Sequence, residues 1–276
     1  MIANKKPPAI LLASMLLAAS CSTTSTRQTT ALALDNILAG THRSEQNRAR
    51  DVYRHPKETL LFFGMRPEMN VLEVWPEPGW YTEVIAPLVK DRGKYHAAVI
   101  AADPQSKYVT ARLVDYHDKL AERPDLYGRV AVVTFPTDGS DVVPPRSLDM
   151  IVTFRNIHNW MARDSAGPAF ATMYKALKPG GVLGVTEHRG NPAVPQDPKA
   201  KSGYVNEDYA IRLIEGQGFR LVGESQVNAN PKDTRDYEQG VWTLPPTYRL
   251  GEQDRQKYAA IGESDRFTLK FVKPKR

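Results

Sequence analysis

Apolar residues follow two alternating patterns from residue 57 to the end of the chain. Short, nearly continuous apolar runs are typical of strands buried on both faces of a parallel sheet, and apolar residues three or four positions apart are typical of helices packed on such a sheet. The runs predict seven strands, over residues 70–74, 95–101, 129–135, 148–154, 182–186, 219–224 and 266–272. The helical spacing predicts helices over residues 57–63, 81–89, 107–120, 166–177 and 207–217.

This alternation predicts an α/β fold with a Rossmann-like, doubly wound sheet of seven strands. Residues 227–262, between the last two strands, show no convincing crossover helix, so the last strand is predicted to be antiparallel in a mostly parallel sheet. A connection of that length in a compact domain usually serves as a binding loop or lid. Right-handed crossovers place the carboxyl ends of the parallel strands along one rim of the sheet, and ligands are expected there.

The N-terminal residues 1–21 have the layout of an export signal. Lys5 and Lys6 form a positive start, and residues 9–19 form an apolar run. As a helix this run would span only about 16 Å, too short for a hydrocarbon core of about 30 Å. The small residues before Cys21 resemble a bacterial lipoprotein processing box, in which that cysteine is lipidated. The alternative is an ordinary secretory signal with an incidental cysteine.

The lipoprotein signal implies a periplasmic protein anchored to a membrane by acyl chains on Cys21. By resemblance, the absence of Asp at Ser22 favours the outer membrane. Residues 22–40 are predicted to be a tether, flexible in its Ser/Thr-rich part and ending in a short helix. Residues 41–54 form a highly charged N-terminal helical segment, and the folded domain is predicted to span residues 41–276.

Composition narrows the classes of function. Hydrophobic residues make up 41% of the chain and charged residues 25%, as in soluble globular domains, so most of the chain is expected to fold. The net charge is +6, and the two lysines of the signal account for part of it. The remaining excess is too small and too scattered to indicate a nucleic-acid partner, and none is expected. No His/Cys cluster has the spacing of a metal site, so no metal is expected.

The loop after the first predicted strand carries a cofactor motif. It contains the run Val-Leu-Glu-Val-Trp-Pro-Glu-Pro-Gly, which resembles the first motif of class I S-adenosylmethionine-dependent methyltransferases, an acidic residue followed by alternate glycines. Glu73 stands at the acidic position and Gly79 at the last glycine, while Trp75 and Glu77 replace the other glycines. The resemblance assigns Glu73, Trp75, Gly79 and Tyr81 to an S-adenosylmethionine site. The cationic sulfonium of that cofactor accepts aromatic and carboxylate neighbours.

Two later acidic residues match the same family pattern. Asp103 follows the second predicted strand, where these enzymes place a carboxylate on the ribose hydroxyls, and Asp138 follows the third, where an acidic residue lies near the adenine amino group. The alternatives are a turn-forming aspartate at Asp103 and a solvated loop aspartate at Asp138. The Lys-Pro-Gly-Gly run at residues 178–181 is characteristic of the family, and its predicted role is to end a helix and reverse the chain.

Polar residues at the ends of the fourth and fifth predicted strands are candidates for contact with the methyl acceptor. Arg155, Asn156 and His158 follow the fourth strand, and Glu187 ends the fifth. His158 is the candidate base, because its reference pKa near 6.5 suits proton removal. The alternatives are that His158 only packs the loop and that Glu187 is a surface residue. Methyl transfer from a sulfonium needs mainly alignment, so these four residues are predicted to position the acceptor.

The sequence between residues 41 and 274 is similar to a family of bacterial predicted methyltransferases, many of them exported, on runs such as residues 153–160. The resemblance implies an S-adenosylmethionine-dependent methyltransferase that acts on a small molecule. The competing hypothesis is a lipid-anchored binding module that keeps the fold without the catalysis. Two observations motivate it: the cofactor turn has lost most of its glycines, and the predicted compartment has no evident supply of S-adenosylmethionine.

Overall fold

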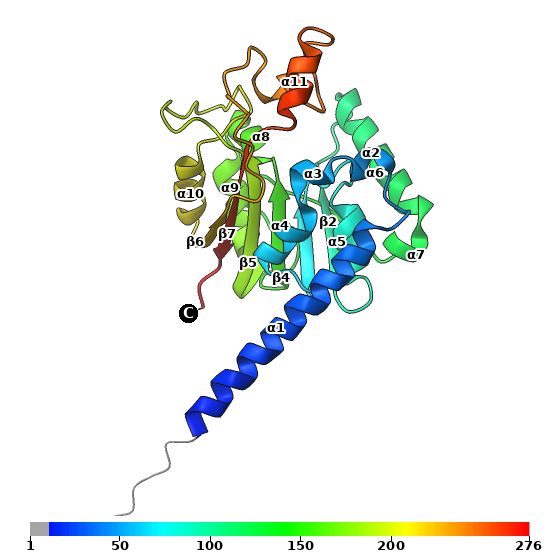
Figure 1. Cartoon of the computed structure of the whole chain (residues 1–276), viewed down its shortest axis with the longest axis vertical. Coiled ribbons are helices and arrows are strands. Elements are labelled where there is room, and N and C mark those ends of the chain that lie inside the picture. Colours follow the sequence, from blue (N-terminus) through cyan, green and yellow to red (C-terminus); the bar gives the residue numbers. More distant parts are fainter. Residues whose placement is uncertain (1–10, 276) are drawn as a thin grey trace, which may run out of the picture.

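The structure, a computed structural model, describes residues 11–275, with side chains from residue 25 onward. Its seven strands form one sheet in the order β3-β2-β1-β4-β5-β7-β6 (Figure 1). They are β1 (Asn70–Val74), β2 (Lys94–Val99), β3 (Ala131–Thr134), β4 (Leu148–Phe154), β5 (Leu177–His188), β6 (Arg220–Ser225) and β7 (Arg266–Val272). Strands β1 to β5 pair in parallel, and β7 pairs antiparallel with β5 and β6. The predicted sheet with its antiparallel last strand is confirmed.

Helices cover both faces of the sheet (Figure 1). One face carries α1 (Leu11–Leu38), α4 (Pro56–Phe63), α5 (Thr82–Val89), α6 (Lys107–Glu122) and α7 (Pro124–Tyr127). The other carries α8 (Ile157–Ala162), α9 (Ala166–Ala176) and α10 (Glu207–Glu215). Two short helices, α2 (Glu45–Arg48) and α3 (Asp51–Arg54), connect α1 to α4.

The central strands hold the two helical layers together because their side chains alternate between the faces. Val71 and Val152 are fully buried against the α4 and α5 layer. Their neighbours Leu72 and Ile151 are fully buried against the α8 and α9 layer. A strand buried on both faces reads as a continuous apolar run, and for this reason β1 and β4 have the bounds that the sequence predicts.

The Lys-Pro-Gly-Gly run lies inside β5, which begins earlier than predicted. Leu177 pairs with Leu148 of β4. The Gly180 N–H donates to the Lys273 carbonyl at 2.8 Å, and the Lys273 N–H donates to the Gly181 carbonyl at 2.9 Å. The helix α9 ends at Ala176, directly before this run, so the chain turns earlier than predicted and the run itself already belongs to the strand. Gly180 takes the left-handed φ of +81° that a glycine adopts without strain.

The segment predicted to be a tether is helical, because α1 runs without a break through it. Its second half packs on the domain, where Leu34 is fully buried. The Arg27 guanidinium donates to the Leu61 carbonyl at 3.0 Å, and Lys57 of α4 forms an ion pair with Asp35 at 2.6 Å. These contacts replace the expected flexible link with a helix fixed to α4 at its C-terminal end.

Residues 1–10 of the predicted signal and the side chain of Cys21 lie outside the described part of the chain. The predicted processing and lipidation therefore stay predictions. Among the residues that the structure describes, no helix is both long and apolar enough to span a membrane.

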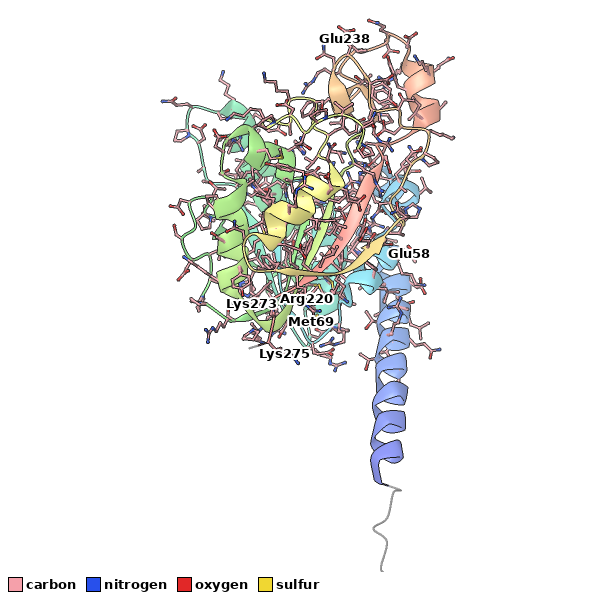
Figure 2. The ribbon with its side chains drawn as sticks, turned by 90° about the vertical axis from the view of Figure 1, so that its left-hand side faces the viewer. Glu58, Met69, Arg220, Glu238, Lys273 and Lys275 are labelled. Atoms are coloured by element: carbon pink, nitrogen blue, oxygen red, sulfur yellow. The ribbon has the colours of Figure 1, made fainter. Side chains whose placement is uncertain are left out.

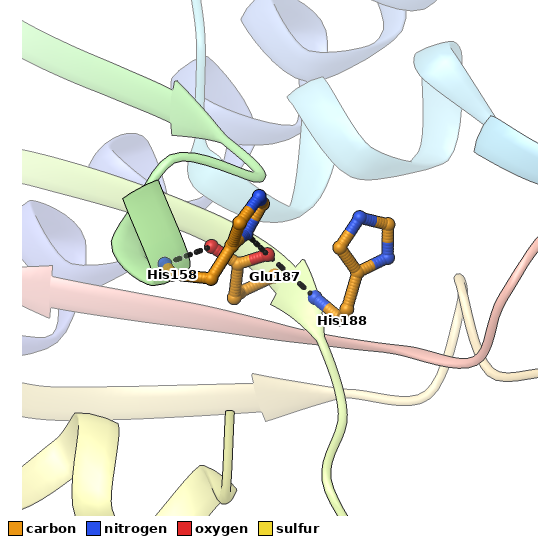
Figure 3. Close-up of side chains that lie close together, drawn as sticks. All are labelled: His158, Glu187 and His188. Carbon is orange, nitrogen blue, oxygen red and sulfur yellow. Dashed lines mark hydrogen bonds and ion pairs between the residues drawn. The ribbon is translucent and has the colours of Figure 1, made fainter. Parts of the chain in front are cut away.

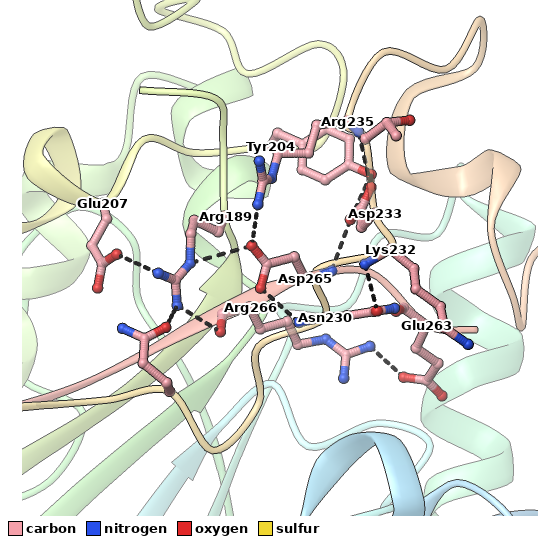
Figure 4. A network of polar contacts seen from close by, with 12 residues as sticks. Arg189, Tyr204, Glu207, Asn230, Lys232, Asp233, Arg235, Glu263, Asp265 and Arg266 are labelled. Carbon is pink, nitrogen blue, oxygen red and sulfur yellow. Dashed lines mark hydrogen bonds and ion pairs between the residues drawn. The ribbon is translucent and has the colours of Figure 1, made fainter. Parts of the chain in front are cut away.

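The insertion between β6 and β7 is a packed structure. It contains the 3-10 helix η1 (Gly240–Thr243) and the helix α11 (Arg255–Ile261). A polar network fastens it to the start of β7 (Figure 4). Asp265 accepts the Asn230 N–H at 2.9 Å, and Asp233 accepts the Asp265 N–H at 2.7 Å and the Tyr204 hydroxyl at 3.0 Å. The insertion is thereby held over the end of the sheet.

Candidate functional site

The predicted ligand loops and the insertion share one end of the domain. Figure 2 shows Glu238 of the insertion at one end of the domain. Met69 and Arg220 lie at the other end, and they mark the starts of β1 and β6. The parallel strands therefore end under the insertion. Ligands of doubly wound folds bind at this carboxyl rim, next to the point where the strand order reverses between β1 and β4.

The turn after β1 keeps the backbone path of a glycine-rich turn. Trp75 has a φ of +51° and Gly79 one of +93°, both left-handed. The φ of Gly79 favours glycine, because a side chain with a Cβ is strained in this region. The Trp75 N–H donates to the Ala98 carbonyl of β2 at 2.8 Å. A tryptophan with positive φ is uncommon and marks backbone strain of the kind that clusters at functional sites.

The Trp75 side chain forms part of an aromatic wall. Its ring lies 5.6 Å from that of Trp160, the Arg163 guanidinium lies 5.6 Å from its centroid, and Phe135 stacks on Trp160 at 6.0 Å. The indole N–H groups of Trp75 and Trp160 are buried without a hydrogen-bond partner. Buried donors are normally satisfied, and of these two only Trp75 belongs to a half-buried residue beside the turn, whereas Trp160 is fully buried in the core.

Glu73 supports the turn from within the sheet. Its carboxyl group is buried and accepts the Tyr95 hydroxyl at 2.5 Å. Burial raises its pKa to about 8, so the group is mainly protonated at pH 7. Tyr95 and Tyr116 both bond to the Thr82 hydroxyl, at 2.9 and 3.0 Å, which extends the buried network to α5 and α6. Contact between Glu73 and a cofactor stays a prediction.

Glu77, in the turn after β1, places a buried carboxyl group at the end of β2. Glu77 was not among the site residues predicted from the sequence. Glu77 is 6% exposed, and its Oε1 accepts the N–H of Ile100, the first residue after β2. Burial raises the pKa of this carboxyl group above its ordinary value. Asp103, the predicted ribose ligand, is exposed, and its Oδ1 closes a turn by accepting the Gln105 N–H at 3.0 Å.

Asp138, predicted to lie near the adenine, has a similar local role. It is exposed, and its Oδ1 accepts the Ser140 N–H at 2.9 Å and the Ser140 hydroxyl. These hydrogen bonds, with the side-chain one contributing most, lower the pKa of the Asp138 carboxyl group. Its structure is that of a turn-closing aspartate.

Tyr81, which precedes α5, and Arg155, which follows β4, line the same small cavity. The Tyr81 ring stacks on Phe154 with centroids 3.6 Å apart. Arg155 has a φ of +62°, and its N–H donates to the Thr186 carbonyl at 2.7 Å. Its guanidinium forms no hydrogen bond or ion pair with any described residue, although Arg54 and Arg266 line the same small cavity.

Asn156 joins the two strands on either side of the reversal point. Its Nδ2 donates to the Val74 carbonyl at the end of β1 at 2.9 Å and to the Thr153 hydroxyl at 3.1 Å. The side chain is buried, and both amide hydrogens are used within the fold. Asn156 therefore fixes the spacing between the turn after β1 and the loop after β4.

His158 and Glu187 form a buried pair (Figure 3). Glu187 Oε1 lies 3.1 Å from His158 Nδ1, and Oε2 accepts the Ile157 N–H at 2.6 Å. Because a carboxylate only accepts, the shared proton lies on Nδ1, which leaves the Nε2 lone pair free. The Trp242 ring of the insertion packs edge-on against the His158 imidazole, with centroids 6.0 Å apart. The prediction that Glu187 is near His158 at the rim is supported by this geometry, and the surface alternative is wrong because Glu187 is fully buried.

His188 completes a cluster that the sequence spacing did not reveal. One potential ligand atom from each of His158, Glu187 and His188 lies within 4.8 Å of the others, so these residues could hold a metal ion. The His188 Nδ1, however, lies 2.5 Å from the Ser264 hydroxyl, and Glu187 also accepts the His188 N–H at 2.8 Å. Burial, and then the neighbouring His158 and arginines, lower the pKa of His188 well below its ordinary value. The surrounding positive charge disfavours a cation at this point.

Sequence patterns missed several residues of the rim. Arg54, Glu263 and Arg266 lie in or beside the site, and Arg54 is more than 200 positions away from the other two in the chain. One signal for Arg266 was available: an antiparallel last strand begins at the rim where parallel strands end. Arg54 was not assigned to the site from the sequence, and the packing of α3 brings it to the end of β4.

The comparison with known proteins gives matches in structure. No protein-family model and no curated protein matches the chain by sequence. The [4+2]-cyclase SpnF is 17% identical with a TM-score of 0.59 and covers 86% of each chain. An S-adenosylmethionine-dependent methyltransferase from Aquifex aeolicus is 16% identical with a TM-score of 0.54, over 82% of this chain and 93% of that one. Phosphoethanolamine N-methyltransferase 2 from Haemonchus contortus, solved with S-adenosyl-L-methionine, is 15% identical with a TM-score of 0.55, over 81% and 53%.

The fold is that of the class I methyltransferases. The predicted fold class and the resemblance behind it are therefore confirmed at the level of the fold. One of these neighbours is described as a cyclase, so the fold by itself does not fix the reaction.

Proposed function

We propose that this protein is an S-adenosylmethionine-dependent methyltransferase that acts on a small-molecule acceptor. The main support for the proposal is that two features lie at the same rim of the sheet. One is the left-handed turn after β1, and the other is the His158–Glu187 pair at the ends of β4 and β5. The Aquifex and Haemonchus neighbours, which share this fold, are described as methyltransferases. The proposed cofactor side is the β1 and β2 half of the rim, and the proposed acceptor side is the β4 and β5 half.

The residues around the turn fit the proposed cofactor. The unpaired indole N–H of Trp75 and the aromatic wall around it suit a flat, hydrogen-bonding adenine ring. Glu77 places a carboxyl group at the end of β2, where class I enzymes bind the ribose hydroxyls. Its Oε1 is used by Ile100, and its Oε2 has no hydrogen-bond partner on any other described residue. Glu77 is therefore better placed for the ribose than the exposed Asp103.

The remaining residues position the acceptor and accept a proton. When bound, S-adenosylmethionine supplies an electrophilic methyl group. His158 Nε2, freed by the bond from Nδ1 to Glu187, can take a proton from the acceptor. Trp242 covers His158 from the insertion and limits the access of water to the imidazole. Asn156 keeps the two halves of the rim at a fixed distance.

Isothermal titration calorimetry of the full-length protein with S-adenosylmethionine tests this function. We expect micromolar binding that Glu77→Gln weakens by about tenfold or more, because glutamine keeps the bond to Ile100 but presents a donor instead of the second acceptor. The matched change Asp103→Asn is expected to leave the affinity within about twofold. Absence of binding to the unmodified protein contradicts the proposed function. The opposite order of the two variants would assign the ribose contact to Asp103.

A second candidate function is a reaction or binding role without methyl transfer. The neighbour described as a [4+2]-cyclase favours it, as do the bulky Trp75 and the acidic Glu77 in the turn. This candidate includes the non-catalytic, lipid-anchored module. A methyl-transfer assay separates it from the first candidate, because this candidate predicts no formation of S-adenosylhomocysteine from S-adenosylmethionine, even if the cofactor binds.

We further propose that the protein is exported and anchored in the periplasm through a lipidated Cys21, with the outer membrane as the favoured site. The support comes from the signal layout of residues 1–21 and from the direction of α1. Figure 2 shows α1 projecting beyond the end of the domain that carries Met69, away from Glu238. An anchor on α1 would hold the ligand rim facing away from the membrane.

Replacing Cys21 with serine is expected to move the protein from the membrane fraction to the soluble fraction of bacterial cells, because serine cannot carry the thioether-linked lipid. Fractionation and incorporation of labelled palmitate measure the change. Ser22→Ala is the matched control and should remain in the membrane fraction. Equal membrane association of Cys21→Ser would show that lipidation is not the anchor.

A further inference from the structure

Three arginines line one small cavity at the carboxyl rim. Arg54 of α3, Arg155 after β4 and Arg266 at the start of β7 surround it, together with the stacked rings of Tyr81 and Phe154. The cavity has a volume of about 10 Å³, which admits roughly one oxygen-sized group. Arg155 is only half-buried, so a larger molecule can reach the cavity from outside while placing one group within it.

The positive charge at this cavity is only partly balanced. Glu263 forms ion pairs with Arg54 at 3.3 Å, with Arg50 at 2.5 Å and with Arg266. Arg155 pairs with no described residue. Three guanidinium groups therefore share Glu263, and Arg155 adds a fourth positive charge without an ion pair of its own. The other nearby carboxylate, Glu187, already accepts backbone N–H groups and His158.

Several hydrogen-bond donors at the cavity also lack partners. Arg54 Nη2 and Arg266 Nε are buried without a hydrogen bond, and so is the Thr186 hydroxyl of β5. Asn228 presents an unpaired acceptor, its Oδ1, which an arginine N–H can satisfy. Buried charges without partners are costly, and native proteins keep them where a ligand supplies the missing partner.

The unbalanced positive charge and the burial lower the pKa values of two of these arginines. Burial, and then the charge of Arg266, lower the pKa of Arg155 to about 10. Burial, and then the charge of Arg155, lower the pKa of Arg54 well below its ordinary value. An anion in the cavity would oppose both effects, whereas a cation would add to them.

Most of the cavity lies on the acceptor half of the rim, and Tyr81, at the start of α5, lines it on the cofactor side. Phe154 and Arg155 follow β4, Thr186 belongs to β5, Arg266 begins β7 and Asn228 follows β6. The turn that we assign to the cofactor follows β1, on the other side of the reversal point. An anionic group in the cavity is therefore placed beside His158 and the other candidate acceptor contacts.

We propose that the Arg54–Arg155–Arg266 cavity receives one oxygen of a carboxylate or phosphate group, while the rest of that group lies at its mouth beside the half-buried Arg155. Under the proposed function, the ligand that carries this group is the methyl acceptor. Arginine suits this role because its planar group makes paired hydrogen bonds to oxyanions. The acceptor is then an acidic small molecule, held by its anionic group while another of its atoms faces His158.

Binding of inorganic phosphate and of S-adenosylmethionine to the full-length protein, each measured by calorimetry and by thermal melting, tests this proposal. We expect phosphate to raise the melting temperature of the unmodified protein. Arg155→Gln should weaken phosphate binding by about tenfold or more, and Arg155→Lys by less, because lysine keeps the charge. Arg220→Gln, which removes an exposed arginine at the opposite end of the sheet, is the matched control and should bind phosphate normally.

The same variants separate an anion site from a structural role of Arg155 and from a contact with the cofactor. Without phosphate, Arg155→Gln should melt no lower than the unmodified protein, because it removes an unpaired charge; a lower melting temperature would indicate a structural role and overturn the proposal. Phosphate binding of unchanged affinity in Arg155→Gln also overturns the proposal. A parallel loss of S-adenosylmethionine affinity would assign the cavity to the carboxylate of the cofactor. Failure of S-adenosylmethionine to bind would contradict the proposed function alone, because the phosphate measurements still decide whether the anion site exists.

Discussion

Replacing Glu187 with alanine is expected to lower the free energy of unfolding by about 3–5 kcal/mol. Glu187 is fully buried, and it accepts the N–H groups of Ile157 and His188 at 2.6 and 2.8 Å and the His158 Nδ1 proton at 3.1 Å. Alanine would leave these donors buried without a partner and would free the His158 ring. Urea unfolding at pH 7 measures the loss of stability.

The matched variant Glu187→Gln keeps one acceptor oxygen and the side-chain volume, so we expect it to lose about half as much stability. If the alanine variant were as stable as the unmodified protein, the hydrogen bonds to Glu187 would contribute little, and the orientation assigned to His158 would lose its physical basis.

Replacing Glu263 with alanine is expected to cost a similar amount, about 3–5 kcal/mol, because removing one partner of a buried ion pair leaves the other charges unbalanced. Here Arg50, Arg54 and Arg266 would all lose their counterion. The control Glu252→Ala, in the same insertion, removes a side chain that is 88% exposed and should change stability by less than about 0.5 kcal/mol.

Glu263 also predicts a dependence of stability on pH. Burial alone would raise the pKa of its carboxyl group, but Arg266, Arg54 and Arg50 together hold it below its ordinary value of 4.5. Since the folded pKa is the lower one, the stabilisation is present above about pH 4.5 and is lost as the pH falls below that value toward the folded pKa. Urea unfolding at pH 7 and at pH 4 should therefore differ less for Glu263→Ala than for the unmodified protein. An equal difference in both proteins would mean that Glu263 is not the titrating group.

The hydrophobic pattern predicted the sheet well because its central strands are buried on both faces. β1, β4 and β7 begin and end where the apolar runs do. The predictions failed where local pattern and packing disagree. Residues 22–30 are Ser/Thr-rich, yet they continue α1. Residues 157–162, expected to be a loop, form α8, whose first backbone N–H groups are held by Glu187.

The candidate site divides in the same way. Arg155, Asn156, His158 and Glu187 were predicted as site residues because the ends of parallel strands share one rim, and the structure places all four at that rim. The sequence could not predict that Glu77 would lie at the end of β2. Only the fold turns Glu77, from the turn after β1, toward Ile100, while Asp103 closes an exposed turn.

The sequence by itself determined the strands, their alternation with helices, the antiparallel last strand and therefore the rim at which chemistry is expected. These follow from periodicity, which depends on neighbours a few positions apart. Tertiary structure alone decided that Arg54, Arg155 and Arg266 surround one cavity and that Glu263 balances only part of their charge. Such a charge excess is a property of distances in space between segments that are far apart in the chain, and no pattern of adjacent residues encodes it.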